Sequence, residues 1–261
     1  LAEFPQPRPP RETWSQNPVF QQIDAQFTKA HEENPDYTGL HYMTADEVEE
    51  CWQLLRQSLH SVSYETLAHL PTYSQWLSRQ DWTKSYQRHR KNLQLIGLNE
   101  PEKRWVLKNP SHLFALDALF ATYPDALVVQ CHRPAETIMA SMCSLAQHTT
   151  EGWSHSFSGD VIGEDSLETW SRGLRLFNAE RAKHDPAQFC DVDYFEFIKD
   201  PIAAVEGIYR HFGIELTDAG RAAMQASHTE SKQGPRAPKH TYSLADYGLT
   251  AEQVKDAFKG L

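Results

Sequence analysis

Apolar residues follow two different spacings along the chain, and the spacing changes near Arg104. Before this point they recur every three or four residues, which is typical of helices with one buried face. After it, short apolar runs alternate with helical stretches of about 10 to 15 residues, a pattern that indicates βαβ units. The sequence therefore predicts an α/β fold, with a parallel sheet flanked by helices and a mostly helical part before it.

The N-terminal part carries recognisable helix start and stop signals. Asn17 and Thr44 are each expected to cap a helix, and Glu47 completes a capping-box pattern behind Thr44. Two further helices are expected over 73–79 and 82–97.

The α/β part begins at Arg104 and is expected to alternate strands with helices. Strands are predicted over 104–108, 127–131 and 188–194. Helices are predicted over 111–122, 134–148, 165–184, 200–213 and 250–261.

Composition narrows the classes of function. The chain has 261 residues, 40% of them hydrophobic, and a formal net charge of −10 at pH 7. The apolar content suffices for a folded core, and the negative charge argues against nucleic acid and anionic membrane surfaces as partners. No stretch reaches the ~20 apolar residues of a membrane span. No transmembrane segment is predicted, and a cytoplasmic location is expected.

Cysteine and histidine usage gives no sign of a metal site. The cysteines are scattered and form no Cys-x-x-Cys pair, which predicts a reducing compartment without structural zinc. The histidines show no ligand spacing either, so no metal is predicted. The cysteines are Cys51, Cys131, Cys143 and Cys190.

Two expected strands end in cations. Arg133 follows the strand 127–131, with Ser141 eight residues later on the next helix, and Lys108 ends the strand 104–108. Ligands of parallel sheets bind beyond the carboxyl ends of the strands, and a guanidinium group suits a phosphate. An anion site is one interpretation. The alternative is an Arg133 that pairs with a surface carboxylate such as Glu136, and a Ser141 that is merely small.

Three other features have a chemical and a plain interpretation. His112 stands in the first turn after Lys108, where it could act as a base or simply pack. Tyr194 ends the last strand, where tyrosines usually pack. The segment 232–244 concentrates basic residues around Gly and Pro, and by itself it is best explained as a solvated loop.

Together these features resemble the sulfotransferases that use 3′-phosphoadenosine 5′-phosphosulfate (PAPS), and most closely their mycobacterial and actinobacterial branch. That family has an arginine after a strand and a serine eight residues later, as Arg133 and Ser141 stand here. The phrase RWVLKNPSHLFALDALFATYPDALVVQCHR is very similar to that branch's version. YFEFIKDP resembles the family's Tyr-Glu-x-x-x-x-Asp-Pro phrase, with its glutamate one place late. The resemblance covers most of residues 40–250 and implies a P-loop-like α/β fold.

The resemblance also implies roles for individual residues. Arg133 and Ser141 would grip the 3′-phosphate, and Tyr194 would contact the adenosine. Arg236 and Lys239 match a basic loop that closes over the same phosphate. The implied activity is transfer of a sulfuryl group from PAPS to a hydroxyl of a small molecule, lipid or glycan, without a metal.

The catalytic residues are less closely matched. Lys108 is a candidate for steadying a cofactor or transition-state oxygen. For the base, His112 lies three places later than the family's histidine, whereas Glu3 falls about where other branches have a glutamate, so Glu3 is favoured. Trp52, Tyr64, Trp76 and Trp82 would wall the acceptor site, although most of them are expected to be core residues.

Two departures from the family stand out. Pro134 directly follows Arg133, where the family usually has Asp or Asn first. The loop Pro-[Arg/Lys]-Ser-Gly-Thr-Thr, which cradles the phosphosulfate, is absent, and the chain begins LAEFPQP without Met. We therefore expect that the natural N-terminus is missing. A chain that truly starts at Leu1 is not expected to transfer sulfate, and its sheet would expose strand edges.

The expected organisation is one sulfotransferase-like domain over 1–261. Within it, 17–98 would form a helical insert on the acceptor side, 104–215 the α/β core, and 229–261 the closing loop and last helix. A non-catalytic binding protein without the phosphosulfate loop remains an alternative. So does another P-loop-like transferase such as a nucleotide kinase, although a Walker lysine is not found. The acceptor and the oligomeric state, a homo-oligomer included, stay open.

Overall fold

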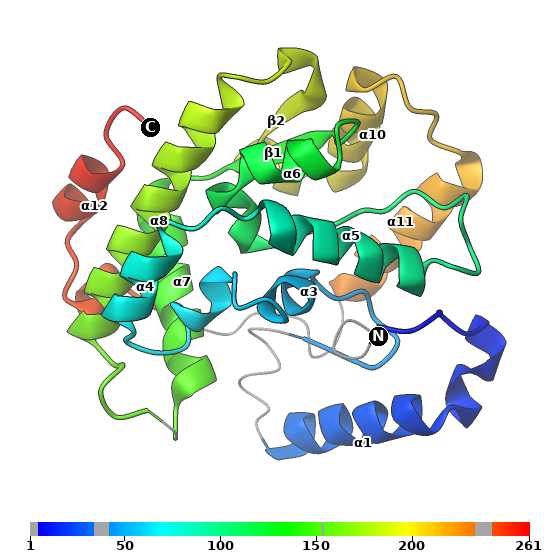
Figure 1. The fold of residues 1–261 in the computed structure, drawn as a ribbon, viewed down its shortest axis with the longest axis horizontal. Helices are drawn as coiled ribbons and strands as arrows, with labels where there is room; N and C mark the ends of the chain where they lie inside the picture. The colour runs from blue at the N-terminus through cyan, green and yellow to red at the C-terminus, as the bar shows by residue number, and fades with distance from the viewer. Residues whose placement is uncertain (1–4, 34–41, 153, 233–241) are drawn as a thin grey trace. The chain divides into compact units, whose positions relative to one another are not determined.

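The computed structural model describes residues 5–33, 42–152, 154–232 and 242–261. The chain divides into two compact units, Leu1–Thr122 and Tyr123–Leu261, and each is described by itself (Figure 1).

In the described residues of the first unit, all regular elements are helices, joined by non-helical segments. Asn17 caps the first long helix as expected, because its side chain accepts hydrogen bonds from the backbone N–H groups of Val19 and Phe20. The helices expected over 73–79 and 82–97 are present with small shifts at their ends. The elements of this unit are η1 (Arg11–Gln16), α1 (Pro18–Glu33), α3 (Trp52–Arg56), η2 (Val62–Tyr64), α4 (Pro71–Leu77), α5 (Thr83–Ile96), η3 (Pro110–Phe114) and α6 (Leu116–Thr122).

Helix α5 is central to the core of this unit, where it packs against α3 and α6. Tyr86 and Leu93 on α5, Leu55 on α3, and Leu116 and Phe120 on α6 are all buried. Burying apolar side chains from three helices in one core supplies most of the stabilisation that short helices lack by themselves.

The prediction of a helix that starts at Thr44 is wrong for the first half of that helix. The Thr44 hydroxyl does accept a hydrogen bond from the Glu47 N–H, but helix α3 begins only at Trp52. The reason is a long-range bond: the Cys51 N–H, which a helix would direct to Glu47, donates instead to the carbonyl of Lys108 at 3.1 Å. A local capping signal is outcompeted here by a contact from another part of the chain.

The strand expected over 104–108 is also wrong, because these residues are not in a strand. Val106 is 90% exposed and Trp105 is 40% exposed, so the apolar run does not lie in a sheet interior. The helix that follows is interrupted: η3 ends at Phe114, Ala115 departs from helical geometry with φ −156°, and α6 starts at Leu116.

The second unit contains the parallel strand pair that the sequence predicts. Strands β1 and β2 run parallel, with Val128 opposite Phe189 and His132 opposite Asp193. Figure 1 shows the two strands lying side by side. The elements of this unit are β1 (Val128–His132), α7 (Ala135–Thr150), α8 (Asp160–Arg181), η4 (Pro186–Gln188), β2 (Phe189–Asp193), α9 (Tyr194–Lys199), α10 (Pro201–His211), α11 (Asp218–Ser231), η6 (Leu244–Tyr247) and α12 (Ala251–Ala257).

The two long helices of this unit, α7 and α8, pack against each other and against η6 and α12. Gly163 allows α8 to lie close to η6, because a Cβ at this position would lie 2.0 Å from the carbonyl oxygen of Tyr247. Among the helices of the described residues, none is both long and apolar enough to cross a membrane.

Candidate functional site

The carboxyl ends of β1 and β2 meet at the same level, which brings two predicted site residues together. His132 and Asp193 are the last paired residues, so Arg133 and Tyr194 follow at neighbouring positions. The guanidinium carbon of Arg133 lies 4.5 Å from the centre of the Tyr194 ring. This is a cation–π contact between the two strand ends.

The backbone turns sharply at Tyr194, and this turn holds the ring in place. The sequence predicted that Tyr194 ends the strand, whereas the structure makes it the first residue of α9. The Asp193 carboxylate accepts hydrogen bonds from the N–H groups of Phe195 and Glu196, which caps the helix. Tyr194 therefore has a fixed backbone at the point where the strand ends.

The hydrogen-bonding groups of Arg133 are not all paired within the described residues. Its Nε atom is buried, and within the described parts of the chain no hydrogen-bond acceptor reaches it. The plain interpretation of Arg133 as the ion-pair partner of Glu136 is not what the structure shows, because the Glu136 carboxylate lies 3.5 Å from Lys255. A buried guanidinium nitrogen without an acceptor fits a site that takes an anionic ligand.

Ser141 lies in the second turn of α7, and Arg133 and Pro134 directly precede this helix. The buried face of the helix includes Met139, Ala140 and Cys143, whereas Ser141 is partly exposed. Ser141 therefore does not belong to the fully buried face of α7.

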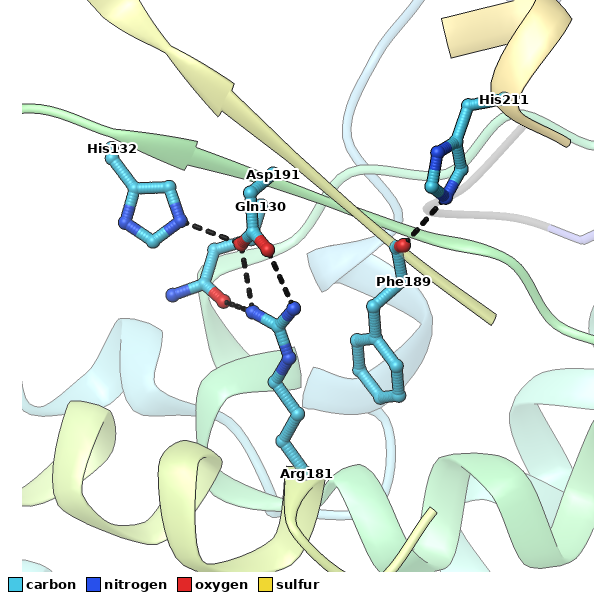
Figure 2. A network of polar contacts seen from close by, with 6 residues as sticks. All are labelled: Gln130, His132, Arg181, Phe189, Asp191 and His211. Atoms are coloured by element: carbon cyan, nitrogen blue, oxygen red, sulfur yellow. Dashed lines mark hydrogen bonds and ion pairs between the residues drawn. The ribbon is translucent and has the colours of Figure 1, made fainter. Parts of the chain in front are cut away.

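A polar network supports the strand ends from one face of the sheet (Figure 2). Arg181, at the end of α8, donates to both oxygens of Asp191 at 2.8 and 2.7 Å and to Gln130 at 2.5 Å. His132 Nε2 lies 2.6 Å from the same Asp191 carboxylate. The Arg181 guanidinium, with His132, holds the pKa of Asp191 well below its usual range. The network ties β1 to β2 one residue before Arg133.

A second anchor fixes the start of β2. His211 on α10 donates from Nε2 to the Phe189 carbonyl at 2.8 Å, as Figure 2 shows. Because both ends of β2 are held, the register that places Tyr194 beside Arg133 is strongly determined.

In the first unit, Lys108 is held by two consecutive residues. Its ammonium group forms an ion pair with the carboxylate of Glu50, and its carbonyl accepts a hydrogen bond from the N–H of Cys51. The Lys108 side chain remains 71% exposed, whereas that of Glu50 is only 20% exposed. Lys108 therefore presents its charge to solvent from a fixed backbone.

His112 has both ring nitrogens engaged inside the same unit. Nδ1 lies 2.7 Å from the hydroxyl of Tyr86, and Nε2 lies 3.5 Å from the sulfur of Cys51. Burial, with a smaller contribution from His89, lowers the pKa of His112 to about 3, so the ring is neutral. Burial likewise raises the pKa of the Cys51 thiol to about 12.

Glu3, Arg236 and Lys239, which the sequence analysis assigned to the base and the closing loop, lie outside the described residues. No group of three or more His, Cys, Asp or Glu side chains in the described ranges could hold a metal ion.

The aromatic residues expected to wall the acceptor site have different environments. Trp82 is 5% exposed and belongs to the core, whereas Trp76 is 40% exposed. The ring centres of Trp52 and Tyr64 each lie 4.9 Å from the guanidinium carbon of Arg56, which forms a cation–π contact with both.

The sequence pattern that defines the sulfotransferase family matches residues 1–218 of this chain. The chain belongs to the sulfotransferase family. It is 69% identical to the crystal structure of sulfotransferase STF1 from Mycobacterium tuberculosis H37Rv, with a TM-score of 0.90 over 100% of this chain and 68% of that one. The family predicted from the sequence is thereby confirmed, and so is the α/β sulfotransferase fold.

Two further sulfotransferases are similar over different lengths. The crystal structure of sulfotransferase STF9 from Mycobacterium avium has 23% identity and a TM-score of 0.79 over 98% of this chain and 65% of that one, and it supports the fold. Omega-hydroxy-beta-dihydromenaquinone-9 sulfotransferase Stf3 of Mycobacterium bovis is 25% identical over 114 residues. That match covers 43% of this chain and 29% of the length of Stf3.

Sequence reasoning missed several residues of these sites. Glu50 and Tyr86 contact Lys108 and His112 from distant parts of the chain, and Asp191 and Arg181 join a strand to a helix. The sequence offers one weak signal, an acidic pair directly before the buried Cys51. Nothing local in the sequence connects that pair to Lys108.

Proposed function

We propose that this sulfotransferase transfers a sulfuryl group from PAPS to a hydroxyl of a small-molecule, lipid or glycan acceptor. The observation that carries the proposal is the pair formed by Arg133 and Tyr194 at the aligned strand ends. It combines a cation with a partly exposed aromatic ring, which are the groups that bind a nucleotide's phosphate and base.

The residues of the second unit would bind the nucleotide part of the donor. The buried Nε of Arg133 fits an anion, because within the described chain it has no acceptor of its own. Arg133 would hold the 3′-phosphate with Ser141 as a further hydroxyl donor, and Tyr194 would contact the adenosine. Arg236 and Lys239 remain proposed contacts to the same phosphate.

PAPS supplies an activated sulfuryl group and a nucleotide that leaves as adenosine 3′,5′-bisphosphate. In the transfer, the acceptor oxygen forms a bond to sulfur while the bond from sulfur to the nucleotide oxygen breaks, and the hydroxyl proton passes to a base. Lys108 would stabilise the negative charge that develops on the oxygens, which is the role of cations in the related phosphoryl transfers.

The proposed base remains Glu3, with His112 as the alternative. A general base needs a nitrogen or oxygen lone pair within reach of the acceptor hydroxyl. The two ring nitrogens of His112 are engaged by Tyr86 and Cys51, and its pKa of about 3 makes it a poor proton acceptor at neutral pH. The contacts of both ring nitrogens therefore argue against His112 as the base.

The name of the relative Stf3 suggests one acceptor class. It describes a sulfotransferase of an omega-hydroxylated dihydromenaquinone, a lipid alcohol. Exposed aromatic and apolar side chains of the first unit, including Trp76, would suit an acceptor that is partly apolar.

Turnover by the intact protein tests the proposal. PAPS would be incubated with the protein and with lipid, glycan and small-molecule alcohols, and adenosine 3′,5′-bisphosphate and the sulfated acceptor would be quantified by mass spectrometry. Equal amounts of both products are expected with at least one acceptor class, and their loss in Arg133→Ala. The control Arg210→Ala changes an exposed arginine at the end of α10. Nucleotide release without a sulfated product, or activity unchanged in Arg133→Ala, would contradict the proposal.

A further inference from the structure

Two consecutive residues from a distant part of the chain hold Lys108, one at its side chain and the other at its backbone carbonyl. Glu50 binds the ammonium group, and Cys51 donates its backbone N–H to the Lys108 carbonyl at 3.1 Å. The Cys51 sulfur also lies 3.6 Å from that carbonyl. The two residues are separated from Lys108 by more than fifty positions, so only the tertiary fold creates this arrangement.

A chain of hydrogen bonds extends from Cys51 through His112 into the interior of the first unit. A thiol with a pKa of about 12 keeps its proton, which it can donate to the Lys108 carbonyl. The Cys51 sulfur then accepts from Nε2–H of His112, and Nδ1 of His112 accepts from the Tyr86 hydroxyl. Tyr86 itself is fully buried. The chain of hydrogen bonds thus connects the Lys108 backbone to the core.

This arrangement differs from an ordinary surface ion pair. Such pairs contribute little, because ordering two long side chains costs about as much as the attraction returns. The pair of Lys199 with Glu196 is of this kind, because the two residues are three positions apart and their side chains are 67% and 71% exposed. Around Lys108 the backbone bond to Cys51 has already brought the two side chains together, and the Glu50 side chain is mostly buried.

We propose that Glu50 is a positioning residue for Lys108 in sulfuryl transfer. An ammonium group has three N–H donors. Glu50 takes one of them and thereby orients the other two toward the solvent side, where they can meet the oxygens of an anionic group. The inference rests on the proposed function, since it assigns Glu50 a part in the same reaction, through Lys108 and without contact to the substrate.

Kinetics of Glu50→Gln, Lys108→Ala and the double variant test this role. Glu50→Gln should lower kcat about tenfold or more with a smaller change in the KM for PAPS, because an oriented charge acts mainly in the transition state. In the Lys108→Ala background the same substitution should have an effect of less than about twofold, because the two residues act as a unit. Glu50→Asp should restore part of the lost kcat. A purely structural Glu50 would lower the activity of both backgrounds by the same factor, and that result overturns the inference.

The matched control is Glu206→Gln. Glu206 also forms a long-range ion pair, with Arg221, and its side chain is 25% exposed, close to the 20% of Glu50. This substitution should leave kcat unchanged in both backgrounds. Its thermal unfolding, measured beside that of Glu50→Gln, shows how much of any effect comes from stability alone.

Chemical labelling separates the inference from the proposed function. Acetic anhydride should modify Lys108 several-fold faster in Glu50→Gln than in the unchanged protein or in Glu206→Gln, as read by mass spectrometry. An unchanged labelling rate overturns the inference whether or not sulfate is transferred. A raised labelling rate in a protein that transfers no sulfate to any acceptor overturns the proposed function, and the catalytic role of Glu50 with it.

Discussion

Arg133 and Tyr194 lie in contact, with the guanidinium carbon 4.5 Å from the ring centre, because two parallel strands end at the same level. The contact depends on the ring and not on the tyrosine hydroxyl. It orients the guanidinium and leaves a flat aromatic surface beside it, which suits a nucleotide whose phosphate and base bind together.

Tyr194 variants test the contribution of the ring. Tyr194→Ala should weaken binding of adenosine 3′,5′-bisphosphate about tenfold or more, since stacking of one base is worth about 1–3 kcal/mol. Tyr194→Phe keeps the ring and should bind within about threefold of the unchanged protein, because only the hydroxyl is lost. Isothermal titration measures both affinities. Equal losses in the two variants would show that the hydroxyl, and not the ring, contacts the nucleotide.

The Asp191 network should make the protein sensitive to acid. Arg181 and His132 lower the pKa of Asp191 in the folded state, so its stabilising effect is fully present well above the unfolded pKa of about 3.9. The effect declines progressively from about pH 5 downward, as the pH falls toward the lowered pKa of the folded state. Asp191→Asn should lower stability at neutral pH and reduce the decline between pH 5 and 3.

Urea unfolding at several pH values measures this effect. Asp256→Asn changes an exposed aspartate in the last turn of α12; it is the control and should leave the pH dependence as it is. If Asp191→Asn and Asp256→Asn behave alike, the network does not contribute to the folded state.

The buried His89 and the partly buried His112 predict a separate pH dependence at milder acidity. Burial lowers the pKa of His112 to about 3 and that of His89 to about 4, whereas both have pKa values near 6.5 when unfolded. The unfolded state therefore binds more protons between about pH 4 and 6.5, and stability rises with pH over this range by up to about 1.4 kcal/mol per pH unit for each histidine.

Replacing one histidine should reduce that slope. His112→Gln is expected to remove about half of the pH dependence between pH 4.5 and 6.5, as measured by urea unfolding. His155→Gln replaces an exposed histidine and should change nothing. An undiminished slope in His112→Gln would show that His112 binds protons equally in the folded and unfolded states, which contradicts the prediction.

Close packing of α8 against η6 gives a prediction for Gly163. A methyl group at this position would lie 2.0 Å from the Tyr247 carbonyl oxygen, which belongs to the backbone and cannot move aside cheaply. Gly163→Ala should lower the free energy of unfolding by about 1–3 kcal/mol. Gly207→Ala on α10 is the control: nothing lies within 4 Å of its added Cβ, so it should stabilise the helix by up to about 1 kcal/mol. The reverse order of stabilities would contradict the packing.

Elements with strong local signals could be predicted from the sequence. The cap at Asn17, the end of α5 at Gly97 and the apolar runs of β1 and β2 all have a local cause, and the structure contains each of them. The place of Arg133 at the carboxyl end of a parallel strand was predictable as well, because it directly follows the apolar run that forms β1.

Features that depend on distant contacts could not be predicted. The segment 44–51 carries a helix signal, yet the Cys51 N–H bonds to Lys108 and no helix forms before Trp52. The apolar run 104–108 reads as a strand, but a strand requires a neighbour to pair with, and a sequence pattern does not supply one. The contact of Glu50 with Lys108 could not be predicted for the same reason, since only the fold brings the two residues together.

The central claim is that Arg133 binds the 3′-phosphate of the donor nucleotide, and one titration tests it most directly. Adenosine 3′,5′-bisphosphate and adenosine 5′-phosphate would each be titrated into the intact protein and into its Arg133→Ala and Arg210→Ala variants. We predict that the unchanged protein and Arg210→Ala prefer the 3′-phosphorylated nucleotide, and that Arg133→Ala loses this preference, about tenfold or more for a charge-assisted contact. A preference for the 3′-phosphate that persists in Arg133→Ala would contradict the account.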